Sequence, residues 1–232
     1  MPKSPLVSIL VRTRNAGALF GELLGALEAQ TVTDRELVVI DSQSTDGTAE
    51  LAARRGARVL PLDPARFTHA LSTNMGFAAA RGEFVVSLSQ DATPDSPEWL
   101  ARLLAPMGEP DVAAAFGRQL PRPGCFVVER LELARAYPAE ADGPGRVEFS
   151  NVNSITRRAL WAARPFDERL GIAEDLEWAR WAREQGHRVV SLPGAAVRHS
   201  HNYTLGQFYA RCRAEGAALA AFARFRPGLR TL

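Results

Sequence analysis

The chain has 232 residues, of which 46% are hydrophobic and 23% are charged, a composition ordinary for a globular domain. Its formal net charge of +2 gives no support for a nucleic-acid partner. Lys3 is the only lysine among the 28 basic residues, which disfavours any mechanism that needs a catalytic or phosphate-gripping lysine.

The cysteines and the hydrophobic pattern indicate the cellular compartment in which the protein is located. Cys125 and Cys212 lie far apart and match no metal-ligand spacing, which is typical of unpaired thiols in reducing surroundings. The first residues lack a signal-peptide pattern, and no run approaches the ~18 apolar residues that a membrane span needs. We therefore expect a cytoplasmic protein.

The first hundred residues predict strands that alternate with helices. Continuous apolar runs indicate strands buried on both faces, and apolar residues at helical spacing indicate the helices between them. Gly56 is placed to end one helix, and Ser96 followed by Pro97 is typical of a helix start. The expected strands are 6–11, 36–40, 58–62 and 83–88, and the expected helices are 18–30, 49–55 and 68–81.

This alternation favours an α/β fold with a mostly parallel central sheet flanked by helices. Ligands of such sheets bind beyond the carboxyl ends of the strands. Chemistry is therefore expected where the strands stop, at Thr13, Asp41 and residues 89–91.

The regular alternation of predicted strands and helices ends at about residue 121. A proline- and glycine-rich break at 121–124 and a loop at 138–146 precede an expected strand at 147–156. Two helices are expected after it, at 173–185 and 204–225. With no internal repeat and no clear linker, the sequence predicts a single domain over residues 1–232.

Three carboxylates stand out, and each has a structural alternative. Asp41 and Asp91 follow apolar runs, where an aspartate often only bonds its own turn. Asp175 lies at the start of a predicted helix, where acidic residues commonly complement the helix dipole. The structural alternative is weakest for Asp91, because Thr93 and Pro94 could form the turn without it.

No glycine-rich phosphate loop is present, since neither GxGxxG nor GxxxxGK[ST] occurs in the chain. A bound nucleotide would have to be held by carboxylates, strand-end backbone groups and a metal ion, which bridges carboxylate and diphosphate oxygens. His199 and His201 are candidate ligands, because alternate residues of an extended segment share a face. A structural role for these histidines is the alternative.

Taken together, the motifs resemble the family 2 glycosyltransferases over most of the chain, about residues 7–209. The resemblance rests on VSILVRTRN, VVIDSQSTDGT, TNMGFAAARGEFVVSLSQD and AEDLEWARWAREQGHRV, in that order. Within the family, FTHALSTNMG, SLSQDATP, FSNVNSITRRALW, PFDERL and HSHNYTL are most similar to bacterial rhamnosyltransferases of surface-polysaccharide assembly. This resemblance implies the GT-A fold, with a C-terminal helical extension, and dTDP-L-rhamnose as the donor.

The resemblance also implies site residues. General-base catalysis is implied for Asp175, with Glu174 beside it. Donor binding is implied for Thr13, Asn15, Asp41, Asn74, Gln90 and Asp91. Acceptor binding is implied for Asn151, Asn153 and Trp178. A divalent cation, Mg²⁺ or Mn²⁺, is implied at Asp91, His199 and His201.

The same resemblance divides the domain by role. Residues 1–120 would bind the nucleotide sugar, residues 121–203 would carry the catalytic groups and bind a glycan or lipid-linked acceptor, and residues 204–232 would form the C-terminal helix. Ser89 departs from the family pattern, because a carboxylate is expected at this first position of the DxD-like motif. The metal would then have a thinner ligand shell, and metal-independent transfer stays an alternative.

The expected reaction is a single displacement that inverts the anomeric centre, with Asp175 as the base. One alternative is a sugar-nucleotide pyrophosphorylase, which the missing glycine-rich loop and missing lysine disfavour. Another is a non-catalytic module that binds nucleotide or glycan, which Ser89 favours. The final helix, with arginines 211, 213, 224 and 226 and aromatics Phe208, Tyr209, Phe222 and Phe225, suits either peripheral contact with an anionic membrane or packing with solvated arginines.

Overall fold

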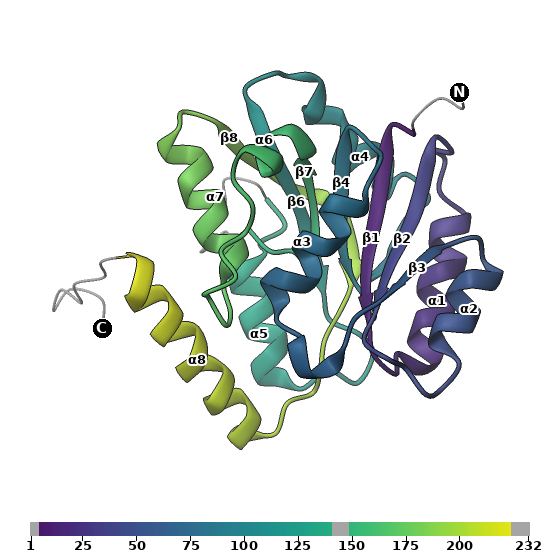
Figure 1. Ribbon diagram of the computed structural model, residues 1–232. Helices are drawn as coiled ribbons and strands as arrows, with labels where there is room; N and C mark the ends of the chain where they lie inside the picture. Colours follow the sequence, from purple (N-terminus) through teal and green to yellow (C-terminus); the bar gives the residue numbers. More distant parts are fainter. Residues whose placement is uncertain (1–4, 141–148, 224–232) are drawn as a thin grey trace, which may run out of the picture.

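The structure, a computed structural model, describes residues 5–140 and 149–223, which are arranged around one mixed sheet (Figure 1). The strand order is β3-β2-β1-β4-β7-β6-β8-β5. The strands are β1 (Val7–Thr13), β2 (Arg35–Asp41), β3 (Arg58–Pro61), β4 (Phe84–Ser89), β5 (Thr93–Pro94), β6 (Val112–Leu120), β7 (Asn153–Arg157) and β8 (Arg188–Arg198).

Helices cover both faces of this sheet (Figure 1). One face is covered by α1 (Gly17–Glu28), α2 (Thr48–Arg54) and α4 (Trp99–Leu104). The other is covered by α3 (His69–Ala79), α6 (Arg158–Ala163) and α7 (Glu174–Glu184). The remaining helical segments are η1 (Pro64–Arg66), η2 (Ala105–Gly108), α5 (Val127–Ala136) and α8 (Leu205–Ala223).

The four strands expected from the first hundred residues form one parallel block of the sheet, and β6 and β8 pair in parallel elsewhere in it. β1 lies between β2 and β4 and runs parallel to both, and β2 in turn pairs with β3 in parallel. On the other side of β4, β7 is antiparallel to both β4 and β6. The expected α/β fold with a central sheet and helices on both faces is confirmed.

The core lies on both faces of β1 because its side chains alternate between two apolar layers. Ile9 and Val11 pack in the layer that contains Phe20 of α1, whereas Leu10 packs in the layer that contains Phe77 of α3. All five side chains are almost fully buried. Burying each one stabilises the fold by roughly 1.5–3 kcal/mol, which holds the carboxyl end of β1 in place.

The sequence expectations lacked several elements, the longest of which are β6, β8 and α5. β6 reads VAAAFGRQL, and its alanines and glycine have low strand propensity although the strand is almost entirely buried. The expected strand at 147–156 begins only at Asn153, and residues 147 and 148 lie outside the described ranges.

Of the two helix ends expected from the sequence, one lies at the expected residue and the other is displaced. Gly56 ends the segment after α2 with a φ of +78°, a conformation that favours glycine. The helix expected at Ser96-Pro97 begins later, at Trp99, because the Ser96 hydroxyl accepts the N–H of Glu98 in a turn instead. Within the described residues, no helix is long and apolar enough to cross a membrane.

Candidate active site

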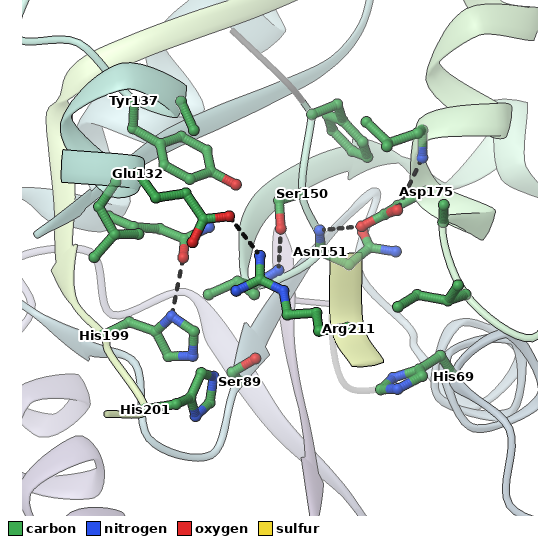
Figure 2. A pocket seen from close by; sticks show the side chains of 18 of the residues that line it. His69, Ser89, Glu132, Tyr137, Ser150, Asn151, Asp175, His199, His201 and Arg211 are labelled. Atoms are coloured by element: carbon green, nitrogen blue, oxygen red, sulfur yellow. Dashed lines mark hydrogen bonds and ion pairs between the residues drawn. The ribbon is translucent and has the colours of Figure 1, made fainter. Parts of the chain in front are cut away.

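Two adjoining pockets open at the carboxyl ends of β1 and β4. The larger, of about 470 Å³, has His199 and His201 on one side and Asp175 on the other (Figure 2). The smaller, of about 310 Å³, is lined by Thr13, Gln90 and other strand-end residues. Four residues line both pockets and are called the junction residues below: Arg12, His69, Ser89 and His201.

Asp91, His199 and His201 form a cluster suited to a metal ion. Their ligand atoms all lie within 4.8 Å of one another. The Nε2 atom of His199 is 3.5 Å from Asp91 Oδ1, and the Nδ1 atom of His201 is 3.5 Å from Asp91 Oδ2. The two histidines that the sequence places near each other are thus brought to Asp91, as expected. Carboxylate and imidazole ligands suit several divalent cations.

The environment of His199 supports this fit. The ring is buried, and burial lowers its pKa to about 4, although the charge of Asp91 acts in the opposite direction. Its Nδ1 is 2.9 Å from Gln119 Oε1, so a neutral ring donates this proton to the amide oxygen. Nε2 then presents a lone pair to Asp91 Oδ1. A cation between these two acceptors would satisfy both.

Two further side chains hold the cluster from outside. The Arg122 guanidinium donates to the backbone oxygen of Asp91 from Nη2 at 2.8 Å and from Nε at 3.3 Å. The buried Glu129 carboxylate accepts the N–H groups of His201 and Asn202, both at 2.8 Å. The backbone on both sides of the cluster is therefore fixed without using its ligand atoms.

Glu174, which is buried, and Asp175, which is half-buried, form an acid pair at the first turn of α7. Asp175 accepts N–H groups through both oxygens, from Asn151 and from Leu176, each at 2.9 Å (Figure 2). Burial raises the pKa of Glu174 to about 7, helped by the Asp175 charge and opposed by Arg12. Burial also raises the pKa of Asp175, against the effect of its two N–H donors. The pair therefore holds protons more tightly than exposed carboxyl groups do.

The predicted donor-binding pair Thr13 and Asp41 meets at the ends of β1 and β2. Thr13 Oγ1 donates to Asp41 Oδ1 at 2.8 Å, and both side chains are buried. Asp41 also accepts the N–H and hydroxyl of Ser44, at 2.9 and 2.6 Å. Much of its hydrogen-bonding capacity thus holds the turn after β2, and Ser42 next to it lines the smaller pocket.

Gln90 and Asn15 connect the loops around this pocket. The Gln90 side chain lines the smaller pocket and accepts the N–H of Arg14 at 2.9 Å. Asn15 has a φ of +47° and accepts the N–H of Thr45 at 2.8 Å, which ties the loop after β1 to the loop after β2. Gln90 is therefore placed to contact a ligand directly, whereas Asn15 shapes the loops.

The prediction that Asn74 binds the donor is wrong, because its amide is fully engaged inside the protein. Its oxygen accepts the Trp161 indole N–H at 2.9 Å and the Phe166 N–H at 3.1 Å. Its nitrogen donates to the Phe166 carbonyl at 3.0 Å and to Glu168 at 2.9 Å. Asn74 instead fastens α3 to the segment after α6.

The predictions that Asn153 and Trp178 contact an acceptor are also wrong. Asn153 is 1% exposed, accepts the Trp99 indole N–H at 2.9 Å and donates to the Ala195 carbonyl at 2.8 Å. Trp178 is 0% exposed and donates its indole N–H to the Arg164 carbonyl at 2.8 Å. Both side chains are part of the core and have no surface to offer a ligand.

Asn151, which was predicted to bind the acceptor, lies at the pocket. It lines the larger pocket, and its backbone N–H holds Asp175. Its side-chain oxygen accepts the Ser154 hydroxyl at 3.1 Å, but its buried Nδ2 has no partner in the structure. A buried donor of this kind is satisfied when a ligand supplies an acceptor.

Several functional residues carry no clear signal in the sequence. Gln119 and Glu129 lie on β6 and α5, two elements that were not expected, and they meet the histidine segment from about 80 and 70 residues away. Arg12 had a usable signal, because it is a charged residue inside the otherwise buried β1. Such a position favours either a buried ion pair or a ligand.

The chain is similar to known proteins over most of its length. It is 32% identical over 220 residues to the O-antigen chain rhamnosyltransferase WbaN of Salmonella anatum, covering 89% of this chain and 70% of the relative. It is 29% identical to RfbN of Salmonella typhimurium, another O-antigen chain rhamnosyltransferase, covering 85% of this chain and 67% of the relative. The chain thus spans about two thirds of the length of these two proteins.

Solved structures share the fold. The mannosyltransferase PcManGT from Pyrobaculum calidifontis, in complex with GDP-Man and Mn²⁺, matches 98% of this chain and 66% of its own, with a TM-score of 0.73 and 23% identity. Glucosyl-3-phosphoglycerate synthase from Mycobacterium tuberculosis, with Mn²⁺ and UDP, matches 97% of this chain and 82% of its own, with a TM-score of 0.71 and 21% identity. These likenesses establish a GT-A-like fold.

The family model described as "Glycosyl transferase family 2" matches residues 8–161. This match includes the ends of β1, β2 and β4, which border the smaller pocket. The chain therefore belongs to glycosyl transferase family 2 and is a glycosyltransferase.

Proposed function

We propose that the protein transfers a sugar from a nucleoside diphosphate donor to a hydroxyl group of a glycan or lipid-linked acceptor, with inversion at the anomeric carbon. The observation that carries this proposal is the placement of two chemical centres around joined pockets. His199 and His201 lie on one side of the larger pocket and Asp175 lies on the other (Figure 2), while Asp91, the third member of the metal-ligand cluster, lines the adjoining smaller pocket.

The donor that the relatives favour is dTDP-L-rhamnose. Both Salmonella proteins are O-antigen chain rhamnosyltransferases, and the likeness to them covers 89% and 85% of this chain. The nucleoside would lie in the smaller pocket, beside Thr13 and Gln90, and the sugar would lie in the larger one. Asn151 would meet a sugar or acceptor oxygen with its unpaired Nδ2.

A Mg²⁺ or Mn²⁺ ion would be held by Asp91, His199 and His201. The facing lone pairs of His199 Nε2 and Asp91 Oδ1 support this assignment. When bound, the ion would stabilise the negative charge that gathers on the departing diphosphate. Both solved relatives described above contain Mn²⁺.

Asp175 is proposed as the general base. Its two N–H donors, from Asn151 and Leu176, fix the carboxylate while the remaining lone pairs are open to an acceptor hydroxyl. The acceptor oxygen bonds to the anomeric carbon as the bond from that carbon to the diphosphate oxygen breaks. The hydroxyl proton moves to Asp175, and the bonding electron pair leaves with the nucleoside diphosphate.

A second candidate function is binding without catalysis, which Ser89 favours because it removes one carboxylate from the expected metal site. One measurement, hydrolysis of the donor without an acceptor, distinguishes the two functions. A catalyst would slowly hydrolyse dTDP-rhamnose to dTDP in the absence of an acceptor, whereas a binding module would leave the donor intact.

Replacing the proposed base gives the first test. We expect Asp175→Asn to lower transfer by about 10²–10⁴-fold, because the amide cannot take the proton, while donor affinity stays within about twofold. Turnover and donor binding would be measured by product formation and by calorimetry. Glu184→Gln, an exposed change at the other end of α7, is the control and should act as wild type. Near-normal turnover in Asp175→Asn would rule out this assignment.

Removing the central carboxylate tests the metal assignment without using activity. Asp91→Asn should weaken Mn²⁺ binding by at least about tenfold, since the cluster loses its one negatively charged ligand. Free Mn²⁺ would be followed by electron paramagnetic resonance. Asp95→Asn, four residues further on and paired with Arg198, is the matched control. Equal Mn²⁺ affinity in wild type and Asp91→Asn would place the metal elsewhere.

The raised pKa of Glu174 predicts how stability depends on pH. The folded protein holds the Glu174 proton more tightly, with a pKa of about 7 against an ordinary 4.5. This stabilisation is therefore complete below pH 4.5 and is lost as pH rises through 7. Glu174→Gln has no such proton to lose, so wild type should lose up to about 3 kcal/mol relative to this variant as pH rises from 4.5 to 8.

Urea unfolding of both proteins at intervals between pH 5 and pH 8 would measure this difference. A difference in unfolding free energy that is the same at every pH would show that Glu174 titrates normally in the folded state.

Peripheral contact with an anionic membrane is part of the proposal, because an exposed apolar surface lies beside the larger pocket. It lies on α5 and α8, which start near each other and diverge (Figure 1). The residues that form it are Phe126, Val127, Val128, Leu131, Leu205 and Tyr209, each more than half exposed. Arg130, Arg135 and Arg213 are exposed on the same helices and could meet anionic lipid heads. The sequence analysis also named Phe222 and Phe225 for membrane contact, but their side chains lie outside the part of the chain that the structure describes.

Vesicle co-sedimentation tests this surface. Wild type should bind phosphatidylglycerol vesicles at low salt and release them as salt screens the arginines, and it should not bind phosphatidylcholine vesicles. The double variant Val127→Ser, Leu131→Ser should lower binding by about tenfold, because two exposed apolar side chains are lost. Absence of binding at low salt would remove the membrane from the proposal.

A further inference from the structure

Arg12 lies at the one place where a donor must cross from one pocket to the other. It is the residue before the last of β1, and it lines both pockets with the other junction residues. If the nucleoside occupies the smaller pocket and the sugar the larger one, as proposed above, the diphosphate that joins them passes the junction. The following inference rests on that placement.

The contacts of Arg12 leave its positive charge without an anion. Its Nη1 approaches His69 Nδ1 at 3.2 Å and the His69 carbonyl at 3.4 Å, and both of these acceptors are neutral. Burial and the charge of Arg12 together lower the pKa of His69 to about 4, so this ring stays uncharged. Within the described residues, no carboxylate oxygen is in ion-pair distance of the Arg12 guanidinium. Glu174 and Asp175 act on it only through space.

A partly buried guanidinium with five donors and no paired anion is costly for a folded protein. This cost is removed when a bound ligand supplies the anion. A diphosphate suits the need, because its oxygens can accept charge-assisted hydrogen bonds from the planar guanidinium.

The sheet register explains why the charge of Arg12 stays available. Arg12 on β1 is the register partner of Ser89 on β4, the neighbouring parallel strand. Side chains of register partners point to the same face of a sheet, with strands about 4.8 Å apart. A carboxylate at position 89 would therefore stand beside Arg12 and neutralise it. The serine leaves the guanidinium free.

We propose that Arg12 is a cation supplied by the protein to bind the donor diphosphate, and that Ser89 keeps this cation unpaired. Arg12 and Ser89 then determine the charge of the site together. The site has one fewer carboxylate at the metal cluster and one more free positive charge at the junction. It follows that a nucleoside diphosphate should bind measurably even without a divalent cation.

The test measures the affinity of dTDP, UDP and GDP by calorimetry, in EDTA and in Mn²⁺, with thymidine as a ligand that lacks the diphosphate. In EDTA, Arg12→Met should weaken binding of the preferred nucleoside diphosphate by about 10–100-fold and leave thymidine unaffected. The affinity of Arg12→Lys for the nucleoside diphosphate should fall between those of wild type and Arg12→Met, because lysine keeps the charge and loses the planar donor pair. Arg66→Met, at an exposed arginine outside both pockets, controls for overall charge and should bind as wild type.

Ser89→Asp provides the complementary change. The new carboxylate should pair with Arg12, so affinity in EDTA should fall about tenfold, and Mn²⁺ should restore more affinity than it does in wild type. Combined with Arg12→Met, Ser89→Asp should have little further effect in EDTA, because the cation it neutralises is already gone. Thermal unfolding of each variant would establish that the proteins are folded.

Two outcomes separate the failure of this inference from the failure of the proposed function. Unchanged nucleoside diphosphate affinity in Arg12→Met, with a shifted pH profile of transfer, would show that Arg12 serves the Glu174–Asp175 pair instead. That result would overturn the role of Arg12 and leave the glycosyl-transfer proposal standing. If wild type binds none of the three nucleoside diphosphates, both proposals fail together.

Discussion

The register of β1 against β4 is the constraint on which the site depends. It places Arg12 beside Ser89 and brings the two strand ends together, so that Thr13 on one strand and Gln90 after the other line the same pocket. The register itself is held by apolar packing, since Ile9 of β1 and its register partner Val86 of β4 are both buried under α1 and α4. A slip of one residue would turn every side chain of β1 to the opposite face and disperse the site.

The site combines burial with incomplete neutralisation of charge. Glu174 is buried and Asp175 is half-buried on α7, and burial is the main reason that their pKa values rise. His199 is buried on the other side of the pocket and stays neutral for the same reason. Low-dielectric surroundings strengthen each charge that remains, so a bound diphosphate and its cation would complete an electrostatic balance that the protein's own residues leave open.

Much of the fold and part of the site could be predicted from the sequence, because apolar periodicity is a local property. Continuous runs identified β1 to β4, and the topology rule for such sheets then indicated their carboxyl ends, with Thr13, Asp41 and residues 89–91. Asp175 was singled out as an acidic residue at a predicted helix start, whereas Asn151 was implied only by the family resemblance. β6 was missed because burial between other layers, and not strand propensity, makes its alanine-rich segment extended.

The errors have a common physical cause. Asn153 and Trp178 lie within three residues of Asn151 and Asp175, yet their side chains point into the core. A motif gives the position of a residue along the chain, but the direction of its side chain depends on the element and on packing. Gln119 is the opposite case: it lies about 80 residues from the histidine motif along the chain, yet its side chain reaches the site and orients the His199 ring.

Ser89 shows how one residue can change the meaning of a motif. Taken alone, it looks like a defect, because it removes a carboxylate from the expected metal ligands. Its register partner changes this interpretation, since a carboxylate there would be opposite Arg12 and each group would neutralise the other. A serine at position 89 therefore has two effects at once: the site has one carboxylate fewer, and the positive charge of Arg12 on the adjacent strand is left available. Motif residues at a sheet edge should therefore be interpreted across the strands as well as along them.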